Sequence, residues 1–332
     1  MKYNQLRLVI TGSRCNLKCA YCIAGYSDSK ITQSSQKIHE EKILAAIRSH
    51  EFSSISIWGG EPFFNFEMLK RTVEFCQRHL SGLPVSIISN GTAFSREKID
   101  FVKNNKLQIV LSHDAGQQHY RSGDFLQNRK QREMINEIED LAFSTVIHRF
   151  NCDFAAIFSY FETAEKLLGR PFGWGIELFE LSSATAMQFL PQGNSIVQFA
   201  NSVDFLLKKF VDGHPLAFSA LNRILMGLAR VIDGERIVST RCGADNRLTV
   251  TTEGETAFCQ VQAENGKFEF PGLSLPVMCL DCEVAKFCAG ICPNITDGYR
   301  KKMCVIYKLF YSKLYAFLIN LPQKVPSYHS SK

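Results

Sequence analysis

Six short apolar runs alternate with helical patterns over the first half of the chain, and this alternation restricts the fold more than any other feature. The runs have strand length and are rich in Val, Ile, Leu and Phe; they cover 6–12, 55–60, 85–91, 107–113, 144–150 and 175–181. Between them, apolar residues recur at helical spacing over 40–49, 66–81, 95–105, 129–142 and 160–168. Strands that alternate with helices predict a parallel sheet with right-handed crossovers. An open doubly wound sheet and a partial barrel both satisfy this pattern.

Beyond the sixth run the alternation of strands and helices no longer continues. Residues 195–233 are predicted to be helical, and 247–260 to form a small hairpin that turns at Glu253–Gly254. A cysteine-dense stretch and an apolar segment, 304–321, follow. Because that segment carries Lys308 and Lys313, we interpret it as an amphipathic helix packed on the body of the protein, and not as a membrane span.

Composition excludes several classes of protein. With 45% hydrophobic and 21% charged residues, the 332-residue chain is expected to fold. Its net charge of +6 comes without a block of Lys and Arg interleaved with aromatics, so nucleic acid is not an expected partner. The first apolar run is broken by Arg7 and has no cleavage site after it, which leaves the cytoplasm as the expected compartment. There, twelve cysteines indicate metal binding or catalysis and not disulfides.

Cys15, Cys19 and Cys22 follow the first predicted strand with the spacing CxxxCxxC. Three thiolates on one short loop can ligate three irons of a [4Fe–4S] cluster and leave the fourth iron open to a cofactor or substrate. Zinc is the alternative. Structural zinc takes four ligands, usually on two CxxC-type arms, and no fourth ligand lies nearby in the sequence.

This triad, with Tyr21 just before its last cysteine, resembles the cluster motif of radical S-adenosylmethionine (radical SAM) enzymes. One strand–helix unit later, the chain matches that family's GGEP motif with Gly59, Gly60, Glu61 and Pro62. In the family, the glycine backbone and the Glu would receive the amino group of the methionine moiety. Glycines let a backbone approach a ligand closely, and a carboxylate satisfies an ammonium.

Two more strand ends resemble cofactor-contacting positions of the same family. They are Ser89 and Asn90 in "SNG", and Ser112 and Asp114 in "SHD". The resemblance favours a partial (β/α)6 barrel over an open sheet. All these residues follow strands, at the end where such folds bind ligands.

The later cysteines resemble the signature of the SPASM domain. Cys242, Gly254 and Cys259 are followed by Cys279, Cys282, Cys288, Cys292 and Cys304 at the expected spacings. The resemblance implies two auxiliary [4Fe–4S] clusters, one ligated by Cys279, Cys282, Cys288 and Cys304, and the other by Cys242, Cys259 and Cys292. Some relatives carry one more cysteine before the first of the seven, where this chain has none. The second of these clusters would then have an open iron that binds substrate, or a non-cysteine ligand such as water, a backbone nitrogen or a carboxylate.

Together the resemblances imply an α/β fold of successive units. These are a radical SAM partial (β/α)6 barrel over 1–185, a helical linker over 186–235, a SPASM domain with a β-hairpin and a C-terminal helix over 236–322, and a flexible tail over 323–332.

Two cysteines remain. Cys76 lies on the apolar stripe of the helix predicted over 66–81 and is expected in the core. Cys152 follows the fifth predicted strand. It could donate a hydrogen atom to a substrate radical, as in epimerases of the superfamily, or be a partly buried structural thiol.

The reaction implied by the resemblance begins with reductive cleavage of S-adenosylmethionine to methionine and a 5′-deoxyadenosyl radical, which abstracts hydrogen from an unactivated C–H bond. Three [4Fe–4S] clusters and S-adenosylmethionine would be the cofactors, and a flavodoxin- or ferredoxin-type protein the reductant. Since SPASM enzymes mostly modify peptides, we expect a radical SAM oxidoreductase that matures a ribosomally made precursor peptide (a RiPP) by thioether or carbon–carbon crosslinking. The chain begins at the first barrel strand, so a separate leader-binding protein is a further expected partner, unless barrel and SPASM surfaces bind the peptide themselves.

Other reactions stay open as alternatives. Sulfatase maturation is disfavoured, because those relatives place Asp directly after the cysteine of the GX4C element, where this chain has Gln260. Peptide epimerisation would need a thiol such as Cys152. A radical SAM dehydrogenase acting on a small carbohydrate or antibiotic is a third alternative. A non-catalytic iron–sulfur or zinc protein is the last, and it would leave the GGEP motif without a purpose.

Overall fold

The computed structural model describes residues 3–10, 15–23, 38–180, 185–234, 246–264, 275–292 and 295–320. Cys242 and the predicted tail, 323–332, lie outside these residues. In the first half the strands are β1 Gln5–Val9, β2 Ser54–Trp58, β3 Val85–Ser89, β4 Gln108–Ser112, β5 Leu141–Ile147 and β6 Gly173–Leu178. The helices between them are α1 Glu40–Ile47, α2 Phe66–His79, α3 Arg96–Asn104, α4 Arg129–Asn136 and α5 Phe154–Leu168. The predicted alternation of strands and helices is confirmed.

Two helix boundaries differ from the sequence-based expectation. Helix α4 ends at Asn136, well before residue 142, because β5 already begins at Leu141. Helix α5 begins at Phe154, earlier than residue 160, because Asp153 caps it: its side chain accepts hydrogen bonds from the backbone N–H groups of Ala155 and Ala156. An Asp N-cap fixes where a helix starts more sharply than apolar spacing does.

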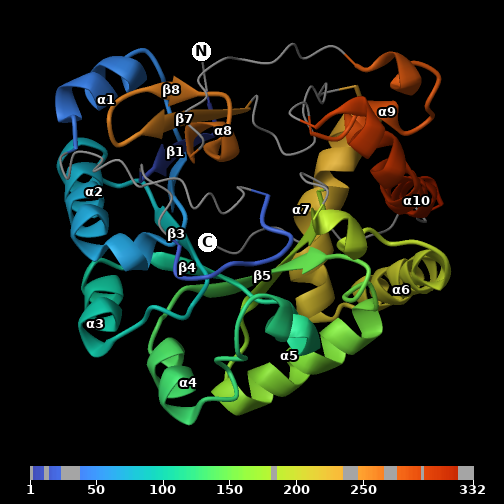
Figure 1. Ribbon diagram of the computed structural model, residues 1–332, viewed down its shortest axis with the longest axis horizontal. Coiled ribbons are helices and arrows are strands. Elements are labelled where there is room, and N and C mark those ends of the chain that lie inside the picture. The colour runs from blue at the N-terminus through green and yellow to red at the C-terminus, as the bar shows by residue number, and fades with distance from the viewer. Residues whose placement is uncertain are drawn as a thin grey trace.

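The strands pair in sequential order. From β6 to β1 every neighbouring pair is parallel, and the helices lie around the outside of the curved sheet (Figure 1). This is the partial barrel predicted from the sequence. Parallel strands all point the same way, so their carboxyl ends meet at one edge of the sheet.

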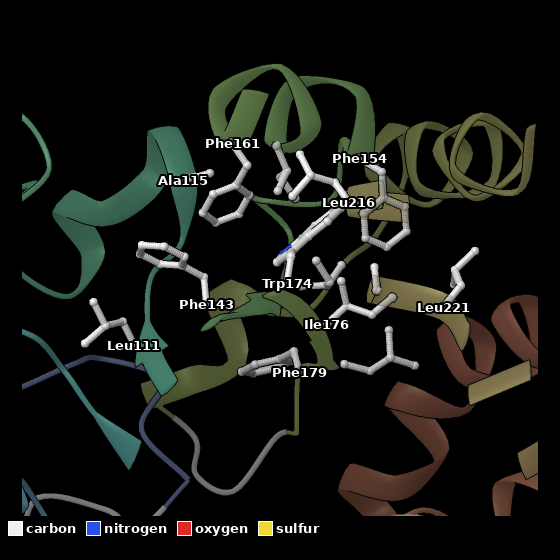
Figure 2. Close-up of a cluster of buried hydrophobic side chains, with 14 of the residues drawn as sticks. Leu111, Ala115, Phe143, Phe154, Phe161, Trp174, Ile176, Phe179, Leu216 and Leu221 are labelled. Atoms are coloured by element: carbon white, nitrogen blue, oxygen red, sulfur yellow. The ribbon is translucent and has the colours of Figure 1, made fainter. Parts of the chain in front are cut away.

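The two faces of the sheet differ in what they carry. Along β4, β5 and β6 buried and more exposed residues alternate strictly. The buried set packs against the outer helices, and Figure 2 shows Phe143, Phe161 and Trp174 gathered there, with ring centroids 5.4 Å apart in successive pairs. The other set, on the inner face, is mostly small or polar, with two valines: Gln108, Val110, Ser112, Ala142, Ser144, Val146, Gly173, Gly175 and Glu177. The inner face is therefore partly open to solvent.

The hairpin predicted over 247–260 is confirmed and has a second role. Strand β7 Arg247–Thr251 pairs antiparallel with β8 Thr256–Ala257, and it also pairs parallel with β1, which extends the sheet. Gly254 turns the hairpin at φ +85°, and a Cβ there would lie 2.2 Å from the Cβ of Lys42 on α1. Glycine is required by both the conformation and the space.

Helices α6 Asn194–Val211 and α7 Pro215–Ile232 precede this hairpin, and α8 Gln260–Glu264 and α9 Ala285–Cys288 follow it. The C-terminal helix, α10 Asp297–Ile319, packs on α6 and α7, as predicted for 304–321 (Figure 1). The hydroxyl of Tyr307 on α10 donates to the carbonyl oxygens of Leu178 (3.3 Å) and Phe179 (3.1 Å). These hydrogen bonds connect α10, the helix that carries Cys304, to the end of β6.

By length and composition, one helix in the described part of the chain could cross a membrane: α7, with a mean hydropathy of 1.3. Its buried residues include Leu216, Leu221 and Leu225, and the helix contacts both β6 and α6. The helix therefore contributes to the core of this fold.

Candidate functional site

The sequence motifs converge at the carboxyl-terminal edge of the sheet. The segment 15–23, here called the cysteine loop, follows β1; Glu61 follows β2, Asn90 follows β3 and Asp114 follows β4. Each motif comes directly after its strand, so the parallel arrangement brings them together. In Figure 1 the dark blue trace of the cysteine loop crosses in front of this end of the sheet.

Hydrogen bonds from the β3 end hold the start of the cysteine loop. Asn90 Nδ2 donates to Cys15 Sγ (3.6 Å) and to Asn16 Oδ1 (2.9 Å). Asn16 Nδ2 in turn donates to Thr92 Oγ1 (2.8 Å), and the backbone N–H of Leu17 donates to Cys15 Sγ (3.4 Å). Cys15 therefore receives two N–H···S hydrogen bonds, an arrangement that also suits a cluster-ligating thiolate.

The GGEP carboxylate is buried and already engaged. Glu61 accepts hydrogen bonds from Ser89 Oγ (2.8 Å) and from the backbone N–H groups of Asn90 (2.6 Å) and Phe63 (3.1 Å). Burial raises the pKa of this carboxyl to about 7, against the effect of these hydrogen bonds. Glu61 thus ties the end of β2 to the end of β3. Its contact with a ligand ammonium stays a prediction.

The glycines before Glu61 are needed for close approach. Gly59 has φ +135°, and a Cβ there would lie 2.7 Å from the carbonyl oxygen of Ile10. Gly60 is exposed, next to the buried Glu61 and Pro62. The backbone at Gly60 is therefore accessible to a ligand at this edge.

The three thiols of the cysteine loop lie within each other's electrostatic influence. The pKa of Cys19 is raised to about 11: burial is the largest cause, the positive charge of Arg121 opposes it, and the neighbouring Cys22 and Cys15 add to it. Cys15 and Cys19 are partly buried, and Cys22 is exposed. Three neighbouring thiols with one accessible edge fit a [4Fe–4S] cluster that keeps one iron open.

A buried ion pair that the sequence analysis did not find lies beside the cysteine loop. Arg121 Nε donates to Asp114 Oδ2 at 3.1 Å, and the Asp114 side chain is fully buried. The guanidinium carbon lies 5.4 Å from the ring centroid of Tyr21. A cation held here, next to the loop thiols, is suited to a carboxylate ligand.

An aromatic box surrounds the same place. We use this name for Tyr21, Tyr120, His148, Phe150 and Phe189, whose rings contact one another at centroid distances of 4.9 to 6.3 Å. Among the described residues, Tyr21 Oη, His148 Nε2 and the nearby Gln118 Nε2 are buried and have no hydrogen-bond partner. Flat apolar walls with unpaired polar atoms fit a ligand that has a ring and hydrogen-bonding groups.

His148 follows β5 and is fully buried. Its Nδ1 accepts the backbone N–H of Phe150 (3.2 Å), so the proton of the neutral ring is on Nε2. That nitrogen lies 3.8 Å from Asp114 Oδ2, too far for a hydrogen bond. Sequence analysis missed this residue and Arg121, since neither belongs to a motif; their only signal is a polar side chain shortly after a predicted strand.

The residues of "SHD" face different ways. Ser112 is on the partly exposed inner face, and Asp114 is paired with Arg121. His113 lies in the core: Nδ1 accepts the backbone N–H of Ala115 (3.0 Å), and Nε2 contacts Asp124 Oδ1 (3.1 Å). Burial lowers the pKa of His113, so the imidazole is neutral at pH 7.

Cys152 is a buried thiol after β5. It contacts the carbonyl oxygens of Arg149 and Ser195 at 3.4 Å and Gln198 Oε1 at 3.7 Å, and burial raises its pKa to about 11. The backbone here borders a cavity of about 460 Å³ between α5 and residues 115–127. Cys76 is buried in the core, as predicted.

The described C-terminal cysteines divide between two places. The thiols of Cys279, Cys282 and Cys304 lie near one another: burial raises the pKa of Cys279, and Cys304 and Cys282 raise it further. Cys288 is buried at the end of α9. Cys259 lies beside the hairpin, and the next residue, Gln260, accepts a hydrogen bond from Arg7 of β1. Whether Cys242, Cys259 and Cys292 form a ligand set stays a prediction.

Comparisons with known proteins match the part of the chain that carries these motifs. Residues 9–142 match the radical SAM superfamily. The radical SAM cyclopropyl synthase TigE of Paramaledivibacter caminithermalis is 21% identical over 169 residues, 44% of this chain and 36% of TigE. YydG of Bacillus subtilis, named for peptide biosynthesis, is 25% identical over 118 residues, 34% of this chain and 36% of YydG. The chain thus matches just over a third of the length of these relatives.

The similarity in fold extends over almost the whole chain. The solved structure of native anSMEcpe with bound AdoMet and Cp18Cys peptide superposes with a TM-score of 0.67 at 19% identity, covering 95% of this chain and 98% of that one. Residues 9–142, the part of the chain that matches the radical SAM superfamily, contain the cysteine loop and the GGEP motif. The chain as a whole shares the architecture of anSMEcpe, including the elements that follow the barrel.

Proposed function

We propose that the protein is a radical SAM/SPASM enzyme that modifies a ribosomally synthesised precursor peptide by thioether or carbon–carbon crosslinking. The observation that carries the proposal is the convergence of the cysteine loop, Glu61 and the Asp114–Arg121 pair at one edge of the sheet. One relative named for peptide biosynthesis, YydG, and a structure with a bound peptide support the substrate class.

The residues have distinct roles in this proposal. Cys15, Cys19 and Cys22 hold the catalytic [4Fe–4S] cluster, and one-electron cleavage of S-adenosylmethionine supplies the hydrogen-abstracting radical. The Gly59–Gly60 backbone receives the amino group of the cofactor, next to the buried carboxyl of Glu61. Arg121 binds the carboxylate of the cofactor. The ion pair with Asp114 fixes the orientation of the Arg121 guanidinium. The aromatic box encloses the nucleoside and excludes water.

The peptide lies against the inner face of β4–β6, where small residues leave room for a chain. Two auxiliary [4Fe–4S] clusters, one on Cys279, Cys282, Cys288 and Cys304 and the other on Cys242, Cys259 and Cys292, complete the enzyme. A flavodoxin- or ferredoxin-type protein reduces it in the cytoplasm, and a separate protein presents the leader of the precursor. Gln260 cannot act as the carboxylate base found after this cysteine in sulfatase-maturing relatives, and its amide is held by Arg7.

Anaerobic reconstitution tests the proposal. We expect about twelve irons per chain, since three clusters of four are proposed, and production of 5′-deoxyadenosine when dithionite and S-adenosylmethionine are added. Zinc in place of iron, with no cleavage of S-adenosylmethionine, would refute the proposed function.

Cys152→Ala separates crosslinking from epimerisation. The thiol is packed against the carbonyls of Arg149 and Ser195, which favours a structural role. A crosslinking enzyme should therefore keep its product in the variant, measured as a mass change of the peptide. An epimerase would leave the peptide mass unchanged in the parent protein, and chiral amino-acid analysis would find its D-residue with the parent but not with the variant, although the variant still forms 5′-deoxyadenosine and keeps its iron.

A further inference from the structure

Arg300 is a buried cation in the C-terminal cysteine region, and its side chain is only 8% exposed. Nη2 donates to the carbonyl oxygens of Cys292 (3.2 Å) and Ile295 (2.9 Å), and Nη1 donates to Asp297 Oδ1 (3.1 Å). These three hydrogen bonds fix the guanidinium at the start of α10. Its position is therefore defined by the fold, unlike that of a surface arginine.

The charge of Arg300 is poorly compensated. Asp297 is the only carboxylate within salt-bridge distance among the described residues, and its side chain is 72% exposed, so solvent screens the pair. Arg300 Nε is buried without a hydrogen-bond acceptor in the same part of the chain. A buried cation with an unpaired N–H group is costly unless a negatively charged acceptor lies next to it.

The cysteines around Arg300 indicate what that acceptor is. Cys304 follows Arg300 by four residues on α10, so both side chains project from the same helix face. The charge of Arg300 also acts on Cys279, where it opposes the effects of burial and of the neighbouring thiols on the pKa. On its other side, Arg300 binds the backbone of Cys292. The guanidinium thus lies between cysteines assigned above to two different clusters.

We propose that Arg300 is a positioning residue that raises the reduction potential of the cluster on Cys279, Cys282, Cys288 and Cys304, by its charge and by a hydrogen bond from Nε to a cluster sulfur. Adding one electron makes a cluster more negative by one charge, and a fixed cation stabilises the more negative form. Hydrogen bonds to sulfur act in the same direction. This inference rests on the proposed function, because it requires the auxiliary clusters.

An EPR-monitored redox titration of the full-length, anaerobically reconstituted protein tests the inference. The Cys19→Ala background removes the catalytic cluster and leaves the auxiliary signals. In Arg300→Gln we expect the ratio of reduced to oxidised cluster, at the midpoint potential of the parent protein, to be at least tenfold lower, a downward shift of about 59 mV for one electron. Arg300→Lys keeps the charge and should shift less. Arg129→Gln, a surface arginine with an 85% exposed side chain, is the matched control and should not shift.

An unchanged midpoint in Arg300→Gln, with iron content intact, would overturn the inference and leave Arg300 as a cap for the chain at Cys292 and Ile295. If the variants lose iron, the inference can still be tested on the parent protein. Incorporation of ¹⁵N-arginine should then change the nitrogen hyperfine coupling in the pulsed EPR spectrum of the reduced auxiliary cluster. No change on labelling would also overturn the inference. Absence of iron from the parent protein would instead refute the proposed function.

Discussion

The two cysteine regions of this protein have different surroundings. Cys15, Cys19 and Cys22 lie on a loop at the open edge of the sheet, and Cys22 is exposed. In the C-terminal region Cys279 and Cys288 are buried, and Cys282 and Cys304 are partly buried, with Cys304 on the 23-residue helix α10. A cluster that takes up a ligand needs an accessible edge, whereas one that only passes electrons is better insulated. The difference in burial therefore matches a division between catalysis and electron transfer.

The cations beside the two regions differ in the same way. Arg121 is paired with Asp114, which is fully buried, and it lies over Tyr21 where a cofactor would bind. Arg300 is paired with the exposed Asp297, and its Nε–H has no hydrogen-bond acceptor among the described residues. In the two proposals above, the first cation would bind an incoming ligand and the second would act on an auxiliary cluster. Four predictions test this comparison.

The largest difference is expected between two cysteine substitutions. Cys19→Ala should abolish cleavage of S-adenosylmethionine and lower the iron content by about four per chain. Cys304→Ala should lose iron as well but keep formation of 5′-deoxyadenosine, because its cluster is not the one that binds the cofactor. Chromatographic measurement of 5′-deoxyadenosine and an iron assay check this. Equal loss of S-adenosylmethionine cleavage in both variants would contradict the proposed division between catalysis and electron transfer.

The two aspartates form a matched pair for stability. Asp114→Asn leaves Arg121 buried without its carboxylate, and should lower the free energy of unfolding by about 3–5 kcal/mol. Asp297→Asn makes the same change in charge beside Arg300, but at an exposed side chain, so the loss should stay below about 1 kcal/mol. Urea unfolding followed by tryptophan fluorescence measures both. Similar losses would show that the two ion pairs are equivalent.

The pH dependence of the free energy of unfolding should reflect the titration of Glu61, at the open edge of the sheet. The native pKa of Glu61, about 7, lies above the value of about 4.3 in an unfolded chain. Between these values the native state holds more protons at Glu61, so the contribution of Glu61 to stability is fully present below pH 4.3 and falls by about 3–4 kcal/mol as pH rises to 7. Glu61→Gln should remove this fall from the profile of unfolding free energy against pH. Glu67→Gln, at a 73% exposed position on α2, should leave it unchanged.

The smallest effect concerns the connection between the two regions. Tyr307→Phe removes the hydroxyl that donates to the carbonyl oxygens of Leu178 and Phe179, and should cost about 1 kcal/mol in urea unfolding. Tyr315→Phe is the matched control on α10; its ring packs against Phe287 at a centroid distance of 5.4 Å and should tolerate the change. If both variants unfold like the parent protein, the hydroxyl does not couple α10 to β6.

Most of the barrel could be predicted from the sequence, because each strand is a local apolar run and each helix repeats at its own period. The boundary of α5 was missed, since its N-cap, Asp153, lies among residues with no periodic signal. The pairing of β7 with β1 was also missed. It joins residues some 240 positions apart, and no local pattern encodes which strand covers the free edge of β1.

The candidate site shows the same difference between local sequence patterns and contacts formed only on folding. The cysteines and the GGEP motif are fixed spacings of specialised residues, so the sequence alone determined the class of chemistry and the strand ends that carry it. Only the tertiary structure decided which side chains surround these motifs. Arg121, His148 and Arg300 are ordinary residues in the sequence; burial beside a carboxylate, a tyrosine or a set of thiols gives them their roles. Spacing is a local property of the chain, whereas burial and electrostatic fields depend on residues that only folding brings together.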